Sequence, residues 1–496
     1  MKKRGGLGEL AFQMRHRLLY RGRFKSASRS CQRVGRSIAL WGVLQEAQRI
    51  KKGNVQMSEK LMAGASKIDI TPKDNVWMDG MIRSHESEGV HDPLFARALV
   101  VSPDGKNKKN AVVIVSCDIC AVDADLITNH IRKTASDKTG IPAENMIIAA
   151  THTHSGPATQ GILNPKAEKY TDEEFIPKVI QAICQASDDL RPATMGYGRG
   201  EETTVSHYRR LWTKEGKIIM NWEPYPAENI IGPAEEADNE VGVVKIVSAN
   251  NPDSVIATVY NHAGHPNVMS GDNFMISADY PGLASKIIED KFGGIAMFLN
   301  GAQGTMDIDG LKDRDWEGVT RTGTALGKAV MDIASKIKTQ KTAAKIKSIS
   351  VKFTVPYRTI TSEELSWARK VIAESGGKFA PLADGVGDDY KACLLLKLNE
   401  KKGKSISLET VGIALGEVAL ISFPGELYNE IGAKIKKQSP FKYTYIVVCA
   451  NDHTGYFPTK KAIGEGGYCV DTRNCDTTAE EIIIENALDI LNKLAK

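Results

Sequence analysis

Short apolar runs alternate with segments of helical periodicity between residues 63 and 200. Residues 111–115 and 145–148 have the apolar composition of buried strands, whereas residues 124–133 and 175–183 have the spacing of amphipathic helices. Alternation of this kind is typical of α/β domains, in which helices cover the faces of a sheet. The sequence therefore predicts an α/β fold with mixed β-sheets flanked by helices.

The same pattern continues in the second half of the chain. We expect two strands around a turn at 249–253, a strand at 295–299, an alternating strand at 349–355, a hairpin over 406–423 and a strand at 443–448. We expect helices at 281–290, 320–338 and 478–494, and a segment of mostly helical pattern over 363–402. A Lys-rich stretch at 337–347 marks a candidate subdomain boundary near residue 340.

Charge divides the 496-residue chain into two parts. Residues 1–53 carry 14 Lys and Arg against 2 Asp and Glu, whereas the rest carries 51 basic and 58 acidic residues. The chain after residue 53 is therefore mildly acidic and lacks the excess of basic residues that is typical of nucleic-acid-binding proteins. We expect residues 1–60 to be a basic, disordered extension and residues 61–496 to be the folded domain. A basic extension can attract phospholipid headgroups, which leaves peripheral membrane contact open.

No apolar run approaches the roughly 20 residues of a membrane-spanning helix. The longest candidate, residues 38–44, is also too short and too late for a clear secretory signal. Localisation is therefore left open, with a cytoplasmic protein slightly favoured over an exported one. Eight cysteines are sparse for a disulfide scaffold, so Cys117 and Cys120 are interpreted as buried thiols. Pairing of Cys469 with Cys475 and the oligomeric state are left open.

Two histidines directly follow the strand at 145–148, in the segment Thr151–Pro157, which reads THTHSGP. His152 and His154 stand two residues apart, and Ser-Gly-Pro then ends regular structure. A strand end holds imidazoles rigidly, so the segment indicates a metal or acid–base site. The alternative is a loop with two half-exposed histidines.

The segment resembles the THTHSGP signature of the neutral/alkaline non-lysosomal ceramidase family. Other blocks recur in the family's order: Gly64–Pro72, Ser87–Leu99, Tyr208–Arg210, His265–Pro266, Pro424–Glu426 and Asn451–Tyr456. The resemblance runs from about Ala63 to the end of the chain. It implies a ceramidase-type catalytic domain without the C-terminal β-sandwich domain of longer members.

The resemblance also implies a zinc site. In the family, two His, one Glu and one Tyr hold a catalytic zinc, and the matching positions are His152, His265, Glu426 and Tyr456. His154 is then expected beside the metal, where it donates to the substrate or the oxyanion. Further acid–base or supporting candidates on the same grounds are His262, His453 and Asp279, the last as the acceptor of a ligand histidine's second N–H.

Arg209 matches an arginine that binds a substrate oxygen in the family. Because Tyr208 stands where the family has Asn, a register slip to Arg210 is the alternative. Asp307 stands where active ceramidases carry a required Ser, in the loop 304–309. A carboxylate cannot supply that hydroxyl, but it can act as general base. The alternative is that Asp307 only caps a turn or pairs with a cation.

The function expected from these residues is zinc-dependent hydrolysis of a linear amide by metal-activated water. The substrate would be an N-acyl lipid such as ceramide or a related N-acyl compound, and the missing Ser leaves ceramide itself in question. One alternative is a degenerate member that binds lipid or glycan without turnover. Another is a metal-dependent esterase or phosphoesterase, suggested by Asp307 and Asp309 because aspartates favour hard metals.

Overall fold

The structure is a computed structural model that describes residues 61–308, 314–340 and 345–496 of the chain. The basic extension at 1–60 and Asp309 lie outside these residues, so the predictions made for them stay predictions.

Eight strands form the larger sheet, in the order β14-β12-β11-β6-β1-β3-β4-β5. Their bounds are β1 (Met62–Asp69), β3 (Phe95–Ser102), β4 (Val112–Cys117), β5 (Met146–Ala150), β6 (Arg191–Glu201), β11 (Glu240–Ser248), β12 (Val255–His262) and β14 (Ile295–Asn300). The sheet is mixed, because β4 and β5 pair in parallel, as do β12 and β14, whereas the other neighbours are antiparallel.

This sheet bends at the junction of β1 and β6, which pair over only Met62–Pro192 and Ala63–Arg191. The bend brings the far edges together, and Ser116 Oγ on β4 donates to Phe298 O on β14 at 2.6 Å. The inner face of both halves then shares one hydrophobic core with the second sheet. Strands buried on both faces are expected to be mostly apolar, and all six residues of β4 are buried, with Ser116 the one polar residue among them.

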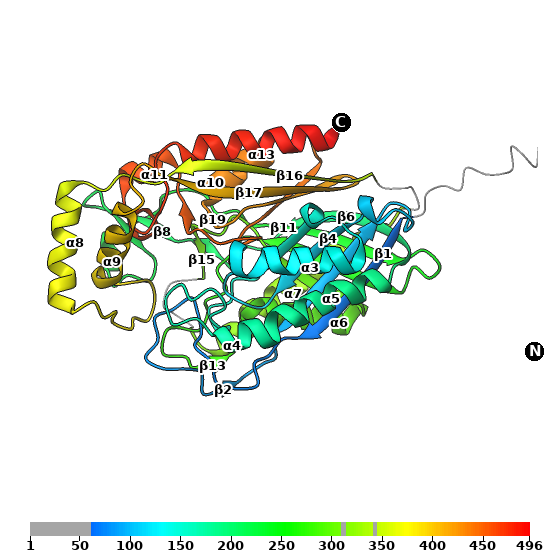
Figure 1. Ribbon diagram of the computed structural model, residues 1–496, viewed down its shortest axis with the longest axis horizontal. Coiled ribbons are helices and arrows are strands. Elements are labelled where there is room, and N and C mark those ends of the chain that lie inside the picture. The colour runs from blue at the N-terminus through cyan, green and yellow to red at the C-terminus, as the bar shows by residue number, and fades with distance from the viewer. Residues whose placement is uncertain (1–60, 309–313, 341–344) are drawn as a thin grey trace, which may run out of the picture. The chain divides into compact units, whose positions relative to one another are not determined.

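Helices cover the outer faces of the bent sheet (Figure 1). α3 (Asn129–Thr139) and α5 (Ile176–Asp188) lie over the half that contains β1 and β3, and α6 (Asp279–Phe292) and α7 (Trp316–Lys336) lie over the half that contains β11 and β14. α5 packs through an apolar stripe that includes Val179, Ile180 and Ile183, the spacing of a single helical face.

The second sheet has four strands in the order β16-β17-β18-β20, with bounds Ile346–Pro356, Ser405–Leu415, Val418–Ser422 and Tyr443–Val447. α10 (Asn429–Gln438) and α13 (Ala479–Ala495) cover its outer face, as Figure 1 shows for α13. A helical hairpin of α8 (Ser362–Ser375) and α9 (Asp388–Asn399) is inserted between β16 and β17 and has a small core of its own.

Short elements complete the described residues. The strands are β2 (Gly89–Val90), β7 (His207–Tyr208), β8 (Arg210–Thr213), β9 (Ile218–Met220), β10 (Ile230–Pro233), β13 (Met275–Ile276), β15 (Met306–Asp307), β19 (Glu426–Leu427) and β21 (Tyr456–Phe457). The helices are α4 (Glu168–Tyr170), α11 (Lys460–Glu465) and α12 (Tyr468–Asp471), with helical turns at Lys108–Asn110, Ala124–Thr128, Ala143–Asn145, Thr171–Phe175 and Ala227–Asn229.

The predicted α/β class with mixed sheets and flanking helices is confirmed. The segment 363–402, predicted to be mostly helical, contains two helices, because Gly376 ends α8 in a left-handed conformation and a non-helical segment follows to Gly387. None of the described helices is long and apolar enough to cross a membrane. Residues Glu59–Lys496 form one unit, and the subdomain boundary near residue 340 stays a prediction.

Candidate metal centre

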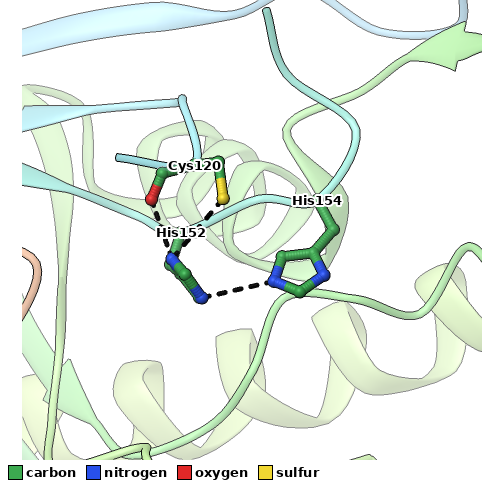
Figure 2. Close-up of side chains that lie close together, drawn as sticks. All are labelled: Cys120, His152 and His154. Atoms are coloured by element: carbon green, nitrogen blue, oxygen red, sulfur yellow. Dashed lines mark hydrogen bonds between the residues drawn. The ribbon is translucent and has the colours of Figure 1, made fainter. Parts of the chain in front are cut away.

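His152 lies two residues past the end of β5 and has a positive φ of 72°, which is uncommon for a residue with a side chain. Its Nδ1–H donates to Cys120 O at 2.8 Å, and because a carbonyl only accepts, this bond fixes the proton on Nδ1. The other ring nitrogen, Nε2, therefore presents a lone pair. Figure 2 shows the ring between Cys120 and His154. A positive φ strains the backbone of a residue other than glycine, and residues strained in this way cluster at functional sites.

His265 reaches the same place from β12, three residues after that strand ends at His262. Asn300, the last residue of β14, joins the two histidine segments by donating to Thr151 O at 3.2 Å and to Gly264 O at 3.0 Å. The Nδ1–H of His265 donates to Met306 O at 2.8 Å, so its Nε2 also presents a lone pair. In both histidines a backbone carbonyl orients the ring.

Glu426 and Tyr456 come from segments that follow two strands of the four-stranded sheet. They are partners in the short parallel pair β19–β21, which follows β18 and β20. Glu426 Oε2 lies 3.1 Å from His265 Nε2 and 3.7 Å from His152 Nε2, and the Tyr456 ring lines the same cavity. The structure thus brings the four residues implied as zinc ligands to one place.

The arrangement of the donors fits a cation. Ligand atoms of His152, His265 and Glu426 all lie within 4.8 Å of one another and are buried. With the Nδ1 protons fixed on carbonyls, His265 Nε2 and Glu426 Oε2 are two acceptors that face each other, and such atoms repel unless a proton or a metal ion lies between them. Imidazole, carboxylate and phenol oxygen are ligands that zinc accepts.

Burial sets the charge of the two kinds of ligand in opposite ways. It lowers the pKa of His152 to about 3, which keeps the imidazole neutral and able to bind a metal. Burial opposes ionisation of Glu426 most strongly, but the neighbouring histidines, His152 first, outweigh burial and hold the pKa of Glu426 well below its usual range. The centre therefore offers a carboxylate, Glu426, beside the neutral imidazole of His152.

Two further histidines adjoin these ligands. His154 Nε2 lies 3.2 Å from His152 Nε2, and burial followed by the charges of neighbouring imidazoles lowers the pKa of His154 well below its usual value. Arg83 holds this residue by donating to His154 O at 2.8 Å, and Gly80 packs so closely that a Cβ there would lie 2.4 Å from the ring. His453 Nε2–H donates to Glu426 Oε1 at 3.0 Å.

Arg209 faces the centre, as the resemblance implied. Its Nη1 lies 3.3 Å from His265 Nε2 and from Asp307 Oδ2, and its guanidinium lies over the Tyr456 ring. Arg210 instead bonds Glu465 at 3.1 Å, so the alternative register is wrong.

Asp307 lies behind Arg209 rather than on the cavity wall. It is fully buried, accepts from Arg209 and from the Ile308 N–H, and is 4.0 Å from Arg314. This is the cation pairing that we set against a catalytic role, and the general-base role itself stays an untested prediction.

Two supporting roles predicted from the sequence are wrong. Asp279 accepts from the N–H groups of Val268 and Tyr280, not from a ligand histidine, because backbone carbonyls occupy both ligand Nδ1 atoms. His262 bonds Ser206 and Glu240 away from the centre.

Cys117 and Cys120 are buried, as predicted, and the seven cysteines among the described residues are all free. Cys469 and Cys475 are thus unpaired. Cys469 Sγ instead accepts from Arg209 at 3.1 Å.

Sequence reasoning missed several residues at the centre. Gln303 Nε2 donates to Glu426 Oε2 at 3.3 Å, and the sulfur atoms of Cys120 and Cys449 lie 3.7 and 3.6 Å from His152 Nδ1. Gln303 directly precedes the loop that begins at Gly304, so the family block could have drawn attention to it. Cys120 was predicted only as a buried thiol, and nothing in the sequence marks Cys449.

The centre opens into a cavity of about 360 Å³. Besides the histidines, Glu426, Arg209 and Tyr456, its wall includes Asp123, Gln160, Ile162, Leu163, Asn267, Asp384, Val386, Tyr390, Leu394, Tyr468, Thr472 and Asn474. A site of this size is within the range of small-molecule pockets.

Residues 61–305 match the family model described as neutral/alkaline non-lysosomal ceramidase, N-terminal. The chain is 28% identical over 223 residues to neutral ceramidase B of Dictyostelium discoideum, which covers 42% of this chain and 28% of that protein. It is 25% identical over 256 residues to the neutral ceramidase of Pseudomonas aeruginosa, covering 49% and 36%. The matched segments span about a third of the length of these curated relatives.

The fold matches solved structures over a longer stretch. The crystal structure of neutral ceramidase from Pseudomonas aeruginosa superposes with a TM-score of 0.67 at 19% identity, covering 88% of this chain and 74% of that one. A structure described as ceramidase complexed with C2 gives a TM-score of 0.68 at 18% identity. At such identity the likeness shows the fold. Together with the family model and the curated relatives, it shows that the chain belongs to the neutral/alkaline non-lysosomal ceramidase family.

Proposed function

We propose that this protein is a zinc-dependent amidohydrolase that cleaves a linear N-acyl amide. The observation that carries the proposal is the pair of acceptors at 3.1 Å, His265 Nε2 and Glu426 Oε2, with His152 Nε2 beside them. Family membership supports it, because the curated relatives are named neutral ceramidases.

His152, His265, Glu426 and Tyr456 would hold the ion. When bound, zinc supplies a Lewis acid that polarises a carbonyl and lowers the pKa of a bound water to about 7. A phenol is a less common zinc ligand than imidazole or carboxylate, so Tyr456 is the member of the set to be tested individually.

The remaining residues hold protons and orient the substrate. His154, kept neutral by burial, offers its Nε2–H as a hydrogen-bond donor to the substrate carbonyl. Arg209 places a permanent positive charge on the cavity wall, where it can stabilise an oxyanion, and Asp307 orients its guanidinium. His453 and Gln303 hold the Glu426 carboxylate in place.

Metal analysis and a substrate panel test the proposal. Protein purified without chelators should contain one zinc per chain and hydrolyse acyl amides in preference to acyl esters and phosphate esters. His265→Gln should remove metal and activity together, whereas His262→Gln, a buried histidine on the same segment but away from the centre, should keep both. Metal-free wild-type protein would refute the zinc site, and a fully loaded protein that cleaves only phosphates would refute amide hydrolysis.

A further inference from the structure

The inserted hairpin of α8 and α9 forms part of the cavity wall. Asp384 and Val386 line the cavity from the connection between the two helices, and Tyr390 and Leu394 line it from α9. The hairpin lies between β16 and β17, whereas the residues of the metal centre come from other segments of the chain. An insertion in the second sheet therefore reaches the cavity into which the metal centre opens.

Asp384 begins a row of four buried side chains whose charges alternate in sign. Its Oδ2 accepts from Arg314 Nη2 at 2.6 Å, and the same Nη2 lies 4.0 Å from Asp307 Oδ1. The other carboxylate oxygen, Asp307 Oδ2, accepts from Arg209 Nη1 at 3.3 Å. All four side chains are 7% exposed or less. The row connects the hairpin to the guanidinium of Arg209, which lines the cavity.

The carboxylate of Asp307 stands between two guanidinium groups. Its two oxygens face Arg209 and Arg314, and Arg314 lies closer to Asp384 than to Asp307. Charges in a buried site are weakly screened, so an ion that loses its nearest partner is attracted more strongly to the next opposite charge. Without the charge of Asp384, Arg314 would compete with Arg209 for Asp307. The bond that orients Arg209 thus depends on a side chain that does not contact it.

The same pair also contacts the segment after a metal ligand, which gives a second role to test. Asn267 follows His265 by two residues, its carbonyl oxygen accepts from Arg314 Nη1 at 2.9 Å, and its Nδ2 donates to Asp384 Oδ2 at 3.4 Å. A role through this segment would act on His265 and would change the zinc content. A role through Arg209 would leave the zinc content unchanged.

We propose that Asp384 is a positioning residue for Arg209: by pairing with Arg314, it keeps Asp307 available to the guanidinium on the cavity wall. The inserted hairpin then controls turnover as well as forming a wall of the cavity. This inference rests on the proposed amidohydrolase function, in which Arg209 stabilises the oxyanion.

Separate measurement of kcat and KM tests the role of Asp384 in the full-length, zinc-loaded protein. The substrate is the acyl amide of the panel that the wild type cleaves fastest. Asp384→Asn should lower kcat by about tenfold, because the orientation of a charged hydrogen-bond donor is lost. KM should stay within about twofold, because an oxyanion exists only in the transition state. In an Arg209→Gln background, Asp384→Asn should lower kcat no further.

Removal of both charges separates a positioning role from a general loss of structure. In the double variant Asp384→Asn with Arg314→Met, no guanidinium competes with Arg209 for Asp307. Replacing both members of a buried ion pair is often neutral, so kcat should return to within about threefold of the wild type. The double variant leaves no buried charge without its partner, so it tests the proposal even if Asp384→Asn does not fold.

Glu409→Gln is the matched control. Glu409 pairs with the buried Arg132 at 2.7 Å, and neither residue lines the cavity. The variant loses a carboxylate from an arginine pair, as Asp384→Asn does, but kcat and KM should both stay at the wild-type values. A fall in kcat as large as that of Asp384→Asn would show that loss of any such pair slows the enzyme, and would overturn the proposal.

Three further results would overturn the positioning role. A rise in KM at constant kcat would show that Asp384 binds the substrate itself, and loss of zinc in Asp384→Asn would show that it acts on His265 through Asn267. A double variant with full zinc that is as slow as Asp384→Asn, or tenfold slower than the wild type, would exclude competition for Asp307. Wild-type protein that holds full zinc but cleaves no amide rejects the proposed function instead.

Discussion

Asp307 and Arg209 form a buried pair whose members face different surroundings. Arg209 lines the cavity, whereas Asp307 is fully buried behind it. The carboxylate therefore reaches the substrate only through the guanidinium. We therefore expect Asp307 to position Arg209, which is the alternative to the general-base role predicted from its place in the sequence.

A double-mutant cycle separates the two roles. If Asp307 acts through Arg209, each of three variants should lower kcat/KM by a similar factor, about ten- to a hundredfold: Asp307→Asn, Arg209→Gln and the double variant. The losses should not add, because all three variants lose the same charge-assisted hydrogen bond. Zinc content and the acidic limb of the pH–rate profile should be unchanged. A loss of the acidic limb in Asp307→Asn alone, with losses that add in the double variant, would establish the general base.

The carboxyl group of Asp279 makes the free energy of unfolding depend on pH. Burial, helped by the charge of Asp92, raises the pKa of Asp279 to about 7 despite the backbone N–H groups that it accepts. Between the unfolded value of 3.8 and this folded value, the folded protein holds a proton that the unfolded chain lacks. The stability from Asp279 is therefore complete below pH 3.8 and is lost as the pH rises through about 7.

Asp279→Asn should remove this contribution to the pH dependence of the free energy of unfolding. Asn tolerates the positive φ of 54° at this position, so the backbone need not change. The difference in melting temperature between wild type and variant should shift in favour of the variant as the pH rises from 4 to 8, at fixed zinc loading. Asp290→Asn, an exposed carboxylate on the same helix, should show no such trend, and a trend of equal size there would refute the assignment.

At the scale of elements, β1 can approach α5 only because residue 64 is glycine. A Cβ on Gly64 would lie 2.2 Å from Ala186 O, which is backbone and cannot rotate away. Gly64→Ala should therefore lower the free energy of unfolding by about 2 to 3 kcal/mol, measured by urea denaturation. Gly464→Ala, in α11 with nothing near its Cβ, should be neutral or slightly stabilising. Equal effects of both substitutions would show that α5 does not pack as described.

Local elements could be predicted from the sequence because their signals are local. The strands β11 and β12, the helices α6 and α13 and the hairpin β17–β18 all occur where apolar periodicity and a turn predicted them. The bend between β1 and β6 could not be predicted, since it depends on pairing Met62 with Pro192. A sequence pattern over a short window carries no information about contacts between residues so far apart in the chain.

The same limit applies to the centre. The ligand positions were named from family blocks, and the structure brings His152, His265 and Glu426 together. The contacts that bring them together, such as Asn300 between Thr151 and Gly264, involve residues with no distinguishing neighbours in the sequence. The sequence left two roles open for Asp307, because its position in a block says nothing about which way its side chain points.

At the scale of the whole molecule, the described elements begin with β1 at Met62. A chain shortened to start at Met57 should therefore fold, bind one zinc and retain the activity of the full chain, since every residue of the centre lies after Ala63. Zinc analysis and a thermal melt check this. Aggregation or zinc loss in the shortened chain would show that the basic extension contributes to the fold.

The centre draws its ligands from both sheets, with the histidines on the eight-stranded sheet and Glu426 after β18 of the four-stranded sheet. During synthesis the two imidazoles emerge long before the carboxylate, so an ion would be held weakly until the second sheet docks. The bound ion would then link the eight-stranded sheet to the four-stranded sheet. Removing the ion should speed amide hydrogen exchange in β5 and β18 together. The metal would then bind tightly only after both sheets have folded and docked, so that metal binding would complete the folding of the chain.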